Sequence, residues 1–260
     1  MATVEWAQAA SIDDVLERMA AIDADLPQDD GVAYFNRMYW QVTKLVDAAV
    51  DSSTFEAGEF LARLDVHFAN RFFEAYAADL DGTTISGAWA PLFEGRARDH
   101  TLPIQFALAG MNAHISHDLP LAVVDTCVEL GKAPLDESPE HHDFTRTNDV
   151  LAVAQEEIKS WFSTGVIATV DQLGGRVDDG FAAFGIHLAR AGAWQTSEVL
   201  WELSANERLD RIFRQGLARS VQMASRGILL RASAGQHGGQ LAEPTDLRLA
   251  LEPPLLIERA

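Results

Sequence analysis

The sequence predicts an all-α fold: a single-domain, multi-helix bundle around a buried central helix at about residues 102–130, with an extended C-terminal tail. Three observations support this prediction. Apolar residues recur with the period of a helix along most of the chain, and no alternating run is long enough to predict a strand. The 260 residues, 48% of them hydrophobic, are also enough to bury one large core.

The first predicted helix begins at a capping motif near the N-terminus. Ser11 and Asp14 have the spacing at which each side chain accepts a hydrogen bond from the other residue's backbone N–H. Pro27 ends this helix. Residues 82–102 carry several glycines and prolines and are predicted to be irregular, with one short turn at 89–93 packed on the core. Further helices are predicted at about residues 31–49, 54–81 (capped by Ser53 or Thr54), 145–170, 181–191, 197–216 and 217–234.

The central segment, residues 102–130, is apolar on every face apart from a few polar side chains. A helix of this kind is normally buried on all sides. Pro120 interrupts it, because a proline inside a helix removes one backbone hydrogen bond and clashes with the carbonyl four residues earlier. We therefore expect the helix to kink or stop there. Gly110, which precedes Pro120 in the same segment, would allow a neighbouring backbone or a ligand to approach closely.

Three polar side chains of this segment form the candidate site. His114 lies three residues before His117 and four before Asp118, so all three are neighbours on a helix. A buried carboxylate needs a partner, and the obvious partners are a histidine, an arginine or a metal ion. The cluster is therefore interpreted either as the wall of a functional pocket or as a polar knot that fixes the register of neighbouring helices.

Other residues are candidates for binding a substrate or a metal. Met111 and Asn112 precede the cluster on the same helix and are predicted to contact a substrate. Arg146 and Asn148 lie just before an apolar helix, in a segment that either starts that helix or closes over the pocket. In the second case Arg146 would bind an anionic group or pair with Asp118. His67 would either join the cluster as a further ligand or cap the edge of the core.

The net charge of −19 disfavours binding to nucleic acid or to anionic lipid, and the arginines between residues 208 and 231 are interpreted as a solvated helix face. The N-terminus lacks the pattern of a signal peptide, and no apolar run is long enough to span a membrane, so we expect a cytoplasmic protein. The single cysteine, Cys127, excludes an internal disulfide. The helical domain is predicted to cover residues 1–234, and residues 235–260 a flexible link and a tail that packs on the domain.

The segment Gly110-Met-Asn-Ala-His-Ile-Ser-His-Asp-Leu-Pro120 resembles the hallmark Gly-Met-Asn-Ala-His-Ile-Asn-His-Asp-Leu-Pro of an uncharacterised bacterial family. The chain departs from it at Ser116, where that family usually has Asn. The resemblance implies a helical fold and an important central motif, but no activity. Weaker matches lie at Arg71-Phe-Phe73, at Trp89 with Leu92-Phe93, at Asp143-Phe144 with Arg146 and Asn148, and at Ala189-Arg190 with Ala193-Trp194 and Glu198.

Three functions are compatible with the cluster. In the first, His114, His117 and Asp118, with His67, bind a divalent metal ion such as Zn²⁺, Fe²⁺ or Mn²⁺ that activates water for hydrolysis. In the second, Asp118 orients a histidine as general acid or base, in a cyclase, isomerase or tailoring enzyme of secondary metabolism that acts on a hydrophobic small molecule. In the third, the protein is a non-catalytic binding or scaffold protein. A homodimer is compatible with each of them.

Overall fold

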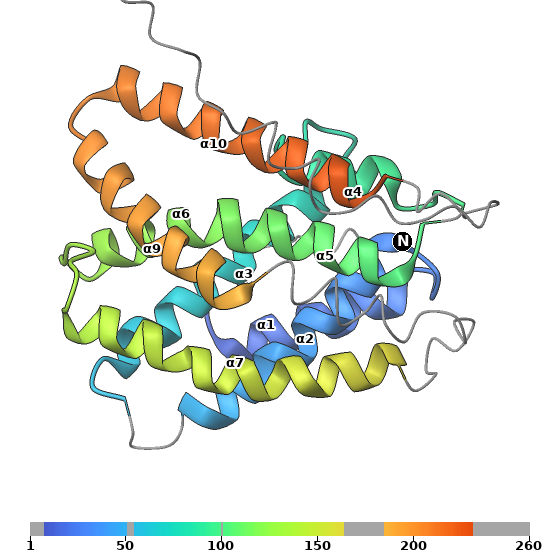
Figure 1. Ribbon diagram of the computed structural model, residues 1–260, viewed down its shortest axis with the longest axis horizontal. Helices are drawn as coiled ribbons and strands as arrows, with labels where there is room; N and C mark the ends of the chain where they lie inside the picture. Colours follow the sequence, from blue (N-terminus) through green and yellow to red (C-terminus); the bar gives the residue numbers. More distant parts are fainter. Residues whose placement is uncertain (1–7, 51–54, 100, 164–184, 231–260) are drawn as a thin grey trace, which may run out of the picture. The chain divides into compact units, whose positions relative to one another are not determined.

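Helices account for all the regular secondary structure in the part of the chain that the computed structural model describes, which is residues 8–50, 55–99, 101–163 and 185–230 (Figure 1). The all-α prediction is therefore confirmed. The elements follow one another as α1 Ile12–Asp25, α2 Gly31–Val50, α3 Gly58–Leu80, α4 Ala90–Gly95, α5 Pro103–Ala113, a π-helical turn η1 His114–Asp118, α6 Leu119–Glu129, α7 Pro139–Ser163, α9 Ile186–Leu203 and α10 Glu207–Ile228.

The predicted central helix consists of α5, η1 and α6, which follow one another without a break. In Figure 1 it crosses the middle of the molecule, with α10 above it and α1, α2 and α7 below it. It packs against α2 and α10 along α5 and against α3 and α9 along α6. Nearly every side chain of α5 and α6 is buried, which confirms that this helix is enclosed on all sides.

The N-terminal capping motif forms as predicted. Ser11 Oγ accepts a hydrogen bond from the backbone N–H of Asp14, and Asp14 Oδ2 accepts one from the N–H of Ser11, at 3.2 and 3.1 Å. The resulting α1 packs on α2 and α3 through its apolar face. Asn70 of α3 holds the segment before α1, because its side chain bonds both the N–H and the carbonyl of Ala9.

Some predicted element boundaries are wrong. The helix α7 begins at Pro139 rather than at about residue 145. The predicted start at Ser197 lies inside α9, because the Ser197 hydroxyl is buried and donates to the carbonyl of Trp194 within the same helix. The break falls instead at Asn206, whose side chain accepts from the N–H of Leu209 and caps α10. The predicted cap at Ser53 or Thr54, most of residues 164–184, the end of the last predicted helix after residue 230 and the tail 235–260 lie outside the described residues.

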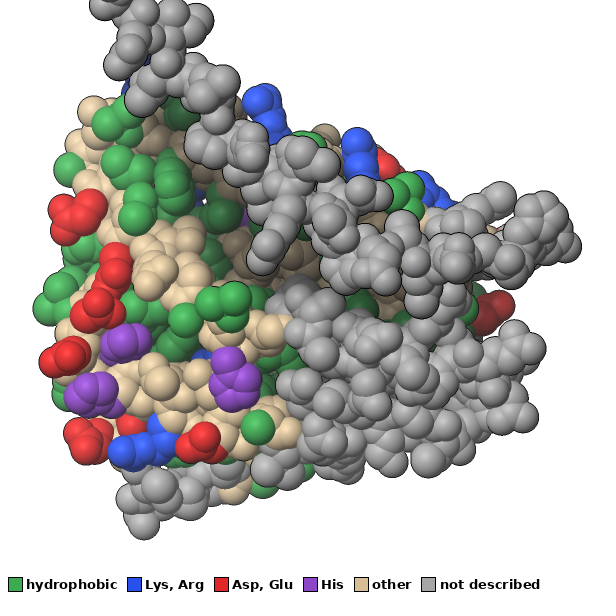
Figure 2. Space-filling view, viewed as in Figure 1, with side chains coloured by type: hydrophobic (Ala, Val, Ile, Leu, Met, Phe, Trp, Pro, Cys, Tyr) green, Lys and Arg blue, Asp and Glu red, His purple; other side chains and the backbone are tan. Residues whose placement is uncertain are grey.

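Charged side chains are unevenly distributed on the face shown in Figure 2. Acidic side chains gather along its left edge, whereas basic ones lie mainly along the upper edge, where Figure 1 places α10. The arginines at 208, 211, 219 and 226 are exposed on α10, and Arg214 pairs with Asp210 at 2.8 Å. This agrees with a solvated helix face. None of the described helices has the length and hydrophobicity that crossing a membrane requires.

Candidate functional site

The predicted cluster lies in the π-helical turn η1, His114–Asp118. The backbone N–H of Leu119 bonds the carbonyl of His114, five residues earlier, which is the hydrogen-bond spacing of a π-helix. Pro120 follows as the second residue of α6, so the wide turn accommodates a proline that an α-helical turn would not. The helix therefore neither stops nor needs a sharp kink at Pro120, in contrast to the prediction; it widens for one turn and continues as α6. Such single turns are frequent at functional sites.

Asp118 is the centre of the cluster. Its side chain is only 3% exposed, and both carboxylate oxygens are occupied. Oδ1 accepts a hydrogen bond from His117 Nδ1 at 2.7 Å, and Oδ2 accepts one from Trp89 Nε1 at 2.8 Å and contacts His114 Nδ1 at 3.2 Å. Because a carboxylate only accepts, these contacts place the protons of both histidines on Nδ1. Burial alone would raise the pKa of Asp118, but the hydrogen bonds and charges of the two histidines lower it to about 2.

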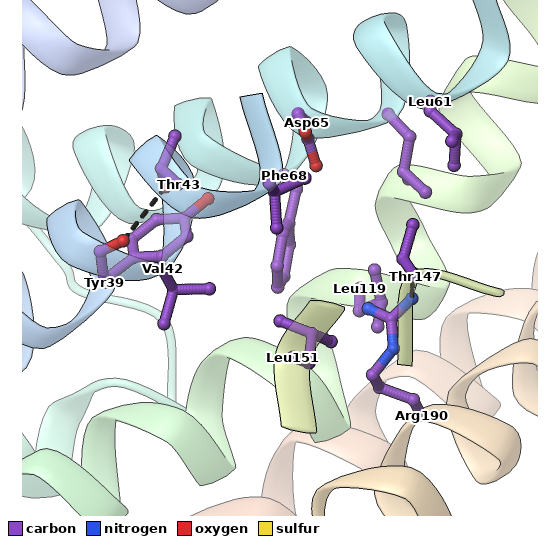
Figure 3. A pocket seen from close by; sticks show the side chains of 12 residues that line it. Tyr39, Val42, Thr43, Leu61, Asp65, Phe68, Leu119, Thr147, Leu151 and Arg190 are labelled. Carbon is purple, nitrogen blue, oxygen red and sulfur yellow. Dashed lines mark hydrogen bonds between the residues drawn. The ribbon is translucent and has the colours of Figure 1, made fainter. Parts of the chain in front are cut away.

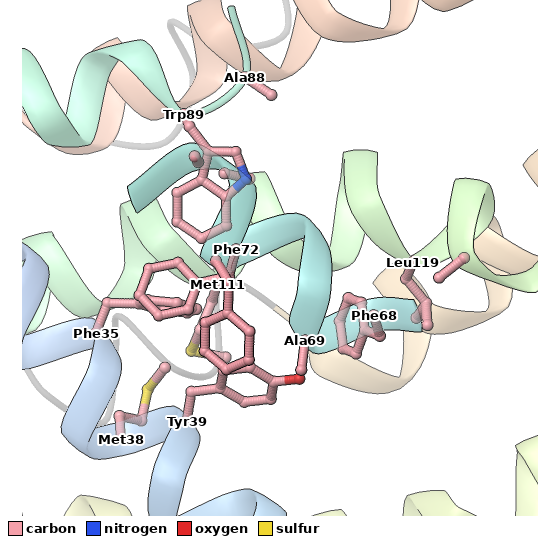
Figure 4. Close-up of a cluster of buried hydrophobic side chains, with 14 of the residues drawn as sticks. Phe35, Met38, Tyr39, Phe68, Ala69, Phe72, Ala88, Trp89, Met111 and Leu119 are labelled. Carbon is pink, nitrogen blue, oxygen red and sulfur yellow. The ribbon is translucent and has the colours of Figure 1, made fainter. Parts of the chain in front are cut away.

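His114 lies in an aromatic surrounding. Phe68 stacks on its ring with the ring centres 3.4 Å apart, and Tyr39, Phe35 and Trp89 pack around it at 4.4, 5.7 and 5.9 Å. Figure 4 shows that these four side chains come from α2, α3 and the start of α4. Burial lowers the pKa of His114 and so favours the neutral ring, against the opposing effect of Asp118. Its Nε2 is buried and has no hydrogen-bond partner among the described residues.

His117 and Asp118 line a cleft of about 350 Å³ on the other side of the cluster. Because Nδ1 of His117 is bonded to Asp118, its Nε2 is the ring nitrogen left for a molecule in the cleft. Arg71 of α3 bonds Asp125, and its Nε is buried without an acceptor among the described residues. The cleft therefore offers an imidazole base and a guanidinium donor. The rest of its wall consists of Glu74, Ala75, Ala78, Thr84, Ser86 and Trp89.

The predicted substrate-binding residues do not line this cleft. Met111 is buried in the core. Asn112 donates to the Val221 carbonyl and to Ser225 Oγ of α10, at 3.1 and 2.9 Å, and so joins two helices. Arg146 lies 3.6 Å from Asp143 rather than beside Asp118. Asn148 accepts a hydrogen bond from Arg190 Nε at 2.8 Å.

His67 is separate from the cluster. Its Nε2 contacts Glu129 Oε2 of α6 at 2.6 Å, and its side chain is 31% exposed. This partly exposed position fits the alternative that His67 caps the edge of the core, and metal binding by His67 stays a prediction. Among the side chains of residues 8–48, 55–99, 101–152 and 185–230, no group of three or more His, Cys, Asp or Glu is arranged to hold a metal ion.

Two residues of the site were missed by the sequence analysis. Trp89 was expected only to pack on the core, yet its indole N–H is a direct partner of Asp118. Arg71 was noted only as part of a weak family match, yet it lines the cleft. The sequence did hold a signal for Trp89. A buried carboxylate such as Asp118 needs hydrogen-bond donors, and a buried indole N–H usually has an acceptor.

Fold and site together define an all-helical protein with a buried His–Asp–His cluster beside a cleft. The chain belongs to a family of unknown function, DUF5995, whose model matches residues 12–231. This confirms the resemblance to an uncharacterised family. No curated protein and no solved structure matches the chain.

Proposed function

We propose that the protein is an enzyme that uses His117 as general acid and base on a small molecule bound in the cleft. The observation that carries this proposal is the 2.7 Å contact of His117 Nδ1 with Asp118 in the cleft wall, which leaves Nε2 as the ring nitrogen available to a bound molecule. An imidazole oriented in this way is the usual protein group for proton transfer near neutral pH.

Asp118 acts as a positioning residue in this proposal. Because the pKa of Asp118 is about 2, its carboxylate stays ionised at neutral pH and stabilises the imidazolium that forms when His117 takes a proton. Trp89 fixes the carboxylate from outside the central helix. His114 holds the second oxygen, and its aromatic surrounding suits a structural role in the same network. The polar-knot hypothesis therefore describes His114 better than it describes His117.

The cleft also indicates the kind of substrate. Its volume of about 350 Å³ suits a small molecule. The Arg71 guanidinium, which lines the cleft, can donate to a carbonyl or an oxyanion, which would place that group beside the base. Ala75, Ala78 and the Trp89 ring supply an apolar wall. The substrate that fits these groups has an apolar body and a polar head, and the reaction class is isomerisation, cyclisation or another proton transfer next to a carbonyl.

Metal-dependent hydrolysis has less support. Both oxygens of Asp118 and both Nδ1 atoms of the histidines are used within the cluster, and His67 is bonded to Glu129. A metal ion at this place would have to displace several of these contacts. The acid–base mechanism uses the hydrogen bonds as they stand.

The experiment compares His117→Gln with His142→Gln, an exposed histidine on α7 outside the cleft. Two probe reactions are measured: hydrolysis of 4-nitrophenyl acetate, and deuterium exchange next to the carbonyl of pyruvate, followed by NMR. We expect His117→Gln to lose about 100-fold or more of the rate of at least one reaction, the usual contribution of a positioned acid–base group. The His142→Gln control should keep the full rate. Equal rates for both variants in both reactions would refute the proposal.

A further inference from the structure

Arg190 of α9 is a buried cation whose hydrogen-bond partners among the described residues carry no charge. It is 8% exposed, and its guanidinium bonds Asn148 Oδ1, the Phe144 carbonyl and Thr147 Oγ1 at 2.8, 2.9 and 2.6 Å. All three acceptors are neutral, and no carboxylate lies within ion-pair distance of it among the side chains that the structure describes, which belong to residues 8–48, 55–99, 101–152 and 185–230. Buried charges in proteins are normally paired. The missing counter-charge points to a bound anion.

A cavity of about 60 Å³ lies next to this guanidinium. Figure 3 shows Asp65 of α3 and Arg190 on opposite sides of it, and Leu61, Leu119 and Leu151 also line it. Asp65 is half-buried, and its charge acts on Arg190 without a direct ion pair between them. Burial raises the pKa of Asp65 to about 7, against the effect of Arg190, so the carboxyl group is partly protonated at neutral pH. At neutral pH it therefore neutralises the cation only in part.

We propose that this cavity is a binding site for a short monocarboxylate of the size of acetate. The carboxylate would pair with the guanidinium, and protonated Asp65 would donate a hydrogen bond to one of its oxygens. The small apolar end would contact the leucine side chains. Because a single water needs about 15 Å³ of such space, a cavity of about 60 Å³ holds only a few heavy atoms.

The apolar side chains that line the cavity favour a carboxylate over an inorganic anion. A carboxylate of this size places a methyl group against Leu61, Leu119 and Leu151, whereas chloride gains nothing from these side chains. A longer fatty acid exceeds the volume. The site is distinct from the cleft at His117, since the two share no lining residue, and the inference does not depend on the proposed function.

The test measures the binding of acetate, acetamide, chloride and hexanoate to the full-length protein by ligand-observed NMR at constant ionic strength and pH 7. We expect saturable binding of acetate only, because acetamide has the same shape without the charge. Replacing Arg190 by Gln should weaken acetate binding at least tenfold. Replacing Arg146, an arginine of α7 that is 42% exposed, by Gln should change it less than twofold.

Asp65→Asn provides a second test that does not depend on the folding of the Arg190 variant. It removes a partial negative charge that faces the incoming carboxylate and keeps a hydrogen-bond donor, so acetate should bind at least as tightly as to the parent protein. His117→Gln should leave the binding unchanged. The proposal is wrong if no saturable binding occurs, if acetamide or chloride binds as well as acetate, or if Asp65→Asn abolishes binding.

Discussion

Trp89 is the one partner of Asp118 among the described residues that comes from outside the central helix. Trp89→Phe keeps an aromatic ring but removes the N–H donor. Because a hydrogen bond to a charged group contributes about 1.5–3 kcal/mol, we expect the free energy of unfolding to fall by about 3 kcal/mol once the smaller ring is included. Urea denaturation at pH 7 measures this change.

Trp40→Phe is the matched control, because the indole Nε1 of Trp40 is buried without a partner among the described residues. It removes a similar part of the ring and no hydrogen bond. We expect it to lower the free energy of unfolding by about 1 kcal/mol. Equal losses in the two variants would mean that the contact between Trp89 and Asp118 adds nothing to stability.

At the scale of single residues, sequence reasoning found the cluster but not all of its partners. The apolar surroundings of His114 and Asp118 predicted their burial, and both are about 2% exposed. Histidine was among the expected partners of the carboxylate, because the spacing on a helix places these groups side by side. Trp89 could not be found in this way, since it lies 29 residues away in sequence and meets Asp118 only through the packing of α4.

Gly110 permits the close packing of α5 on α2. A Cβ atom at this position would lie 2.4 Å from Phe35 Cδ2, and the Phe35 ring packs against Phe72, Trp89 and His114. We expect Gly110→Ala to lower the free energy of unfolding by about 1–3 kcal/mol, because the ring must move within a packed core.

Gly216→Ala in α10 is the control, since a Cβ there meets nothing within 4 Å. Alanine stabilises an exposed helical position by about 0.5–1 kcal/mol relative to glycine. Urea denaturation of the two variants should therefore give changes of opposite sign. The same sign in both would contradict the close contact at Gly110.

At the scale of elements, apolar periodicity predicted where helices exist better than where they begin and end. The helices α2 and α3 bury one apolar stripe and were predicted within a few residues of their observed bounds. The start of α7 was missed because Pro139 is tolerated at the first helical position, where no backbone donor is needed. The π-helical turn could not be predicted from the sequence. Such a turn changes the phase of an apolar stripe, and a segment that is apolar on every side has no such stripe.

The stability of the whole molecule should depend on Asp65 above pH 4. The pKa of Asp65 is raised from 3.8 to about 7, so the folded state holds its proton more tightly than the unfolded chain does. The corresponding stabilisation is complete below pH 4 and is lost as the pH rises to about 7. Asp65→Asn cannot ionise and avoids this loss. One pKa unit corresponds to about 1.4 kcal/mol, so with allowance for partial solvent screening the variant should gain about 2 kcal/mol over the parent by pH 8.

Urea denaturation of both proteins at pH 4, 6 and 8 measures this dependence. The groups that act on Asp65 are Arg190 of α9, which lowers its pKa, and Asp47 of α2, which raises it. Stability curves that stay parallel over this pH range would show that Asp65 titrates as it does in an unfolded chain.

For the molecule as a whole, composition and periodicity predicted the helical class and the enclosed central helix, because both follow from how much apolar surface a chain must bury. A pocket beside the cluster was one of two interpretations of the sequence, but the other residues that line the cleft, and the cavity at Arg190, could not be predicted. The cleft and the cavity are each formed by side chains from distant parts of the chain, such as Arg71 with His117 and Asp65 with Arg190, and their meeting depends on how the helices pack.

The wide turn at His114–Asp118 has a consequence for which sequence changes the protein tolerates. It inserts one residue into an otherwise regular helix. The side chains of α6 are therefore rotated by about 100° about the helix axis, relative to a helix without the insertion. Deleting any one residue of the turn would let the helix run on smoothly, yet would swing α6 away from its contacts with α3 and α9. The number of residues in this turn is therefore constrained as tightly as their chemistry.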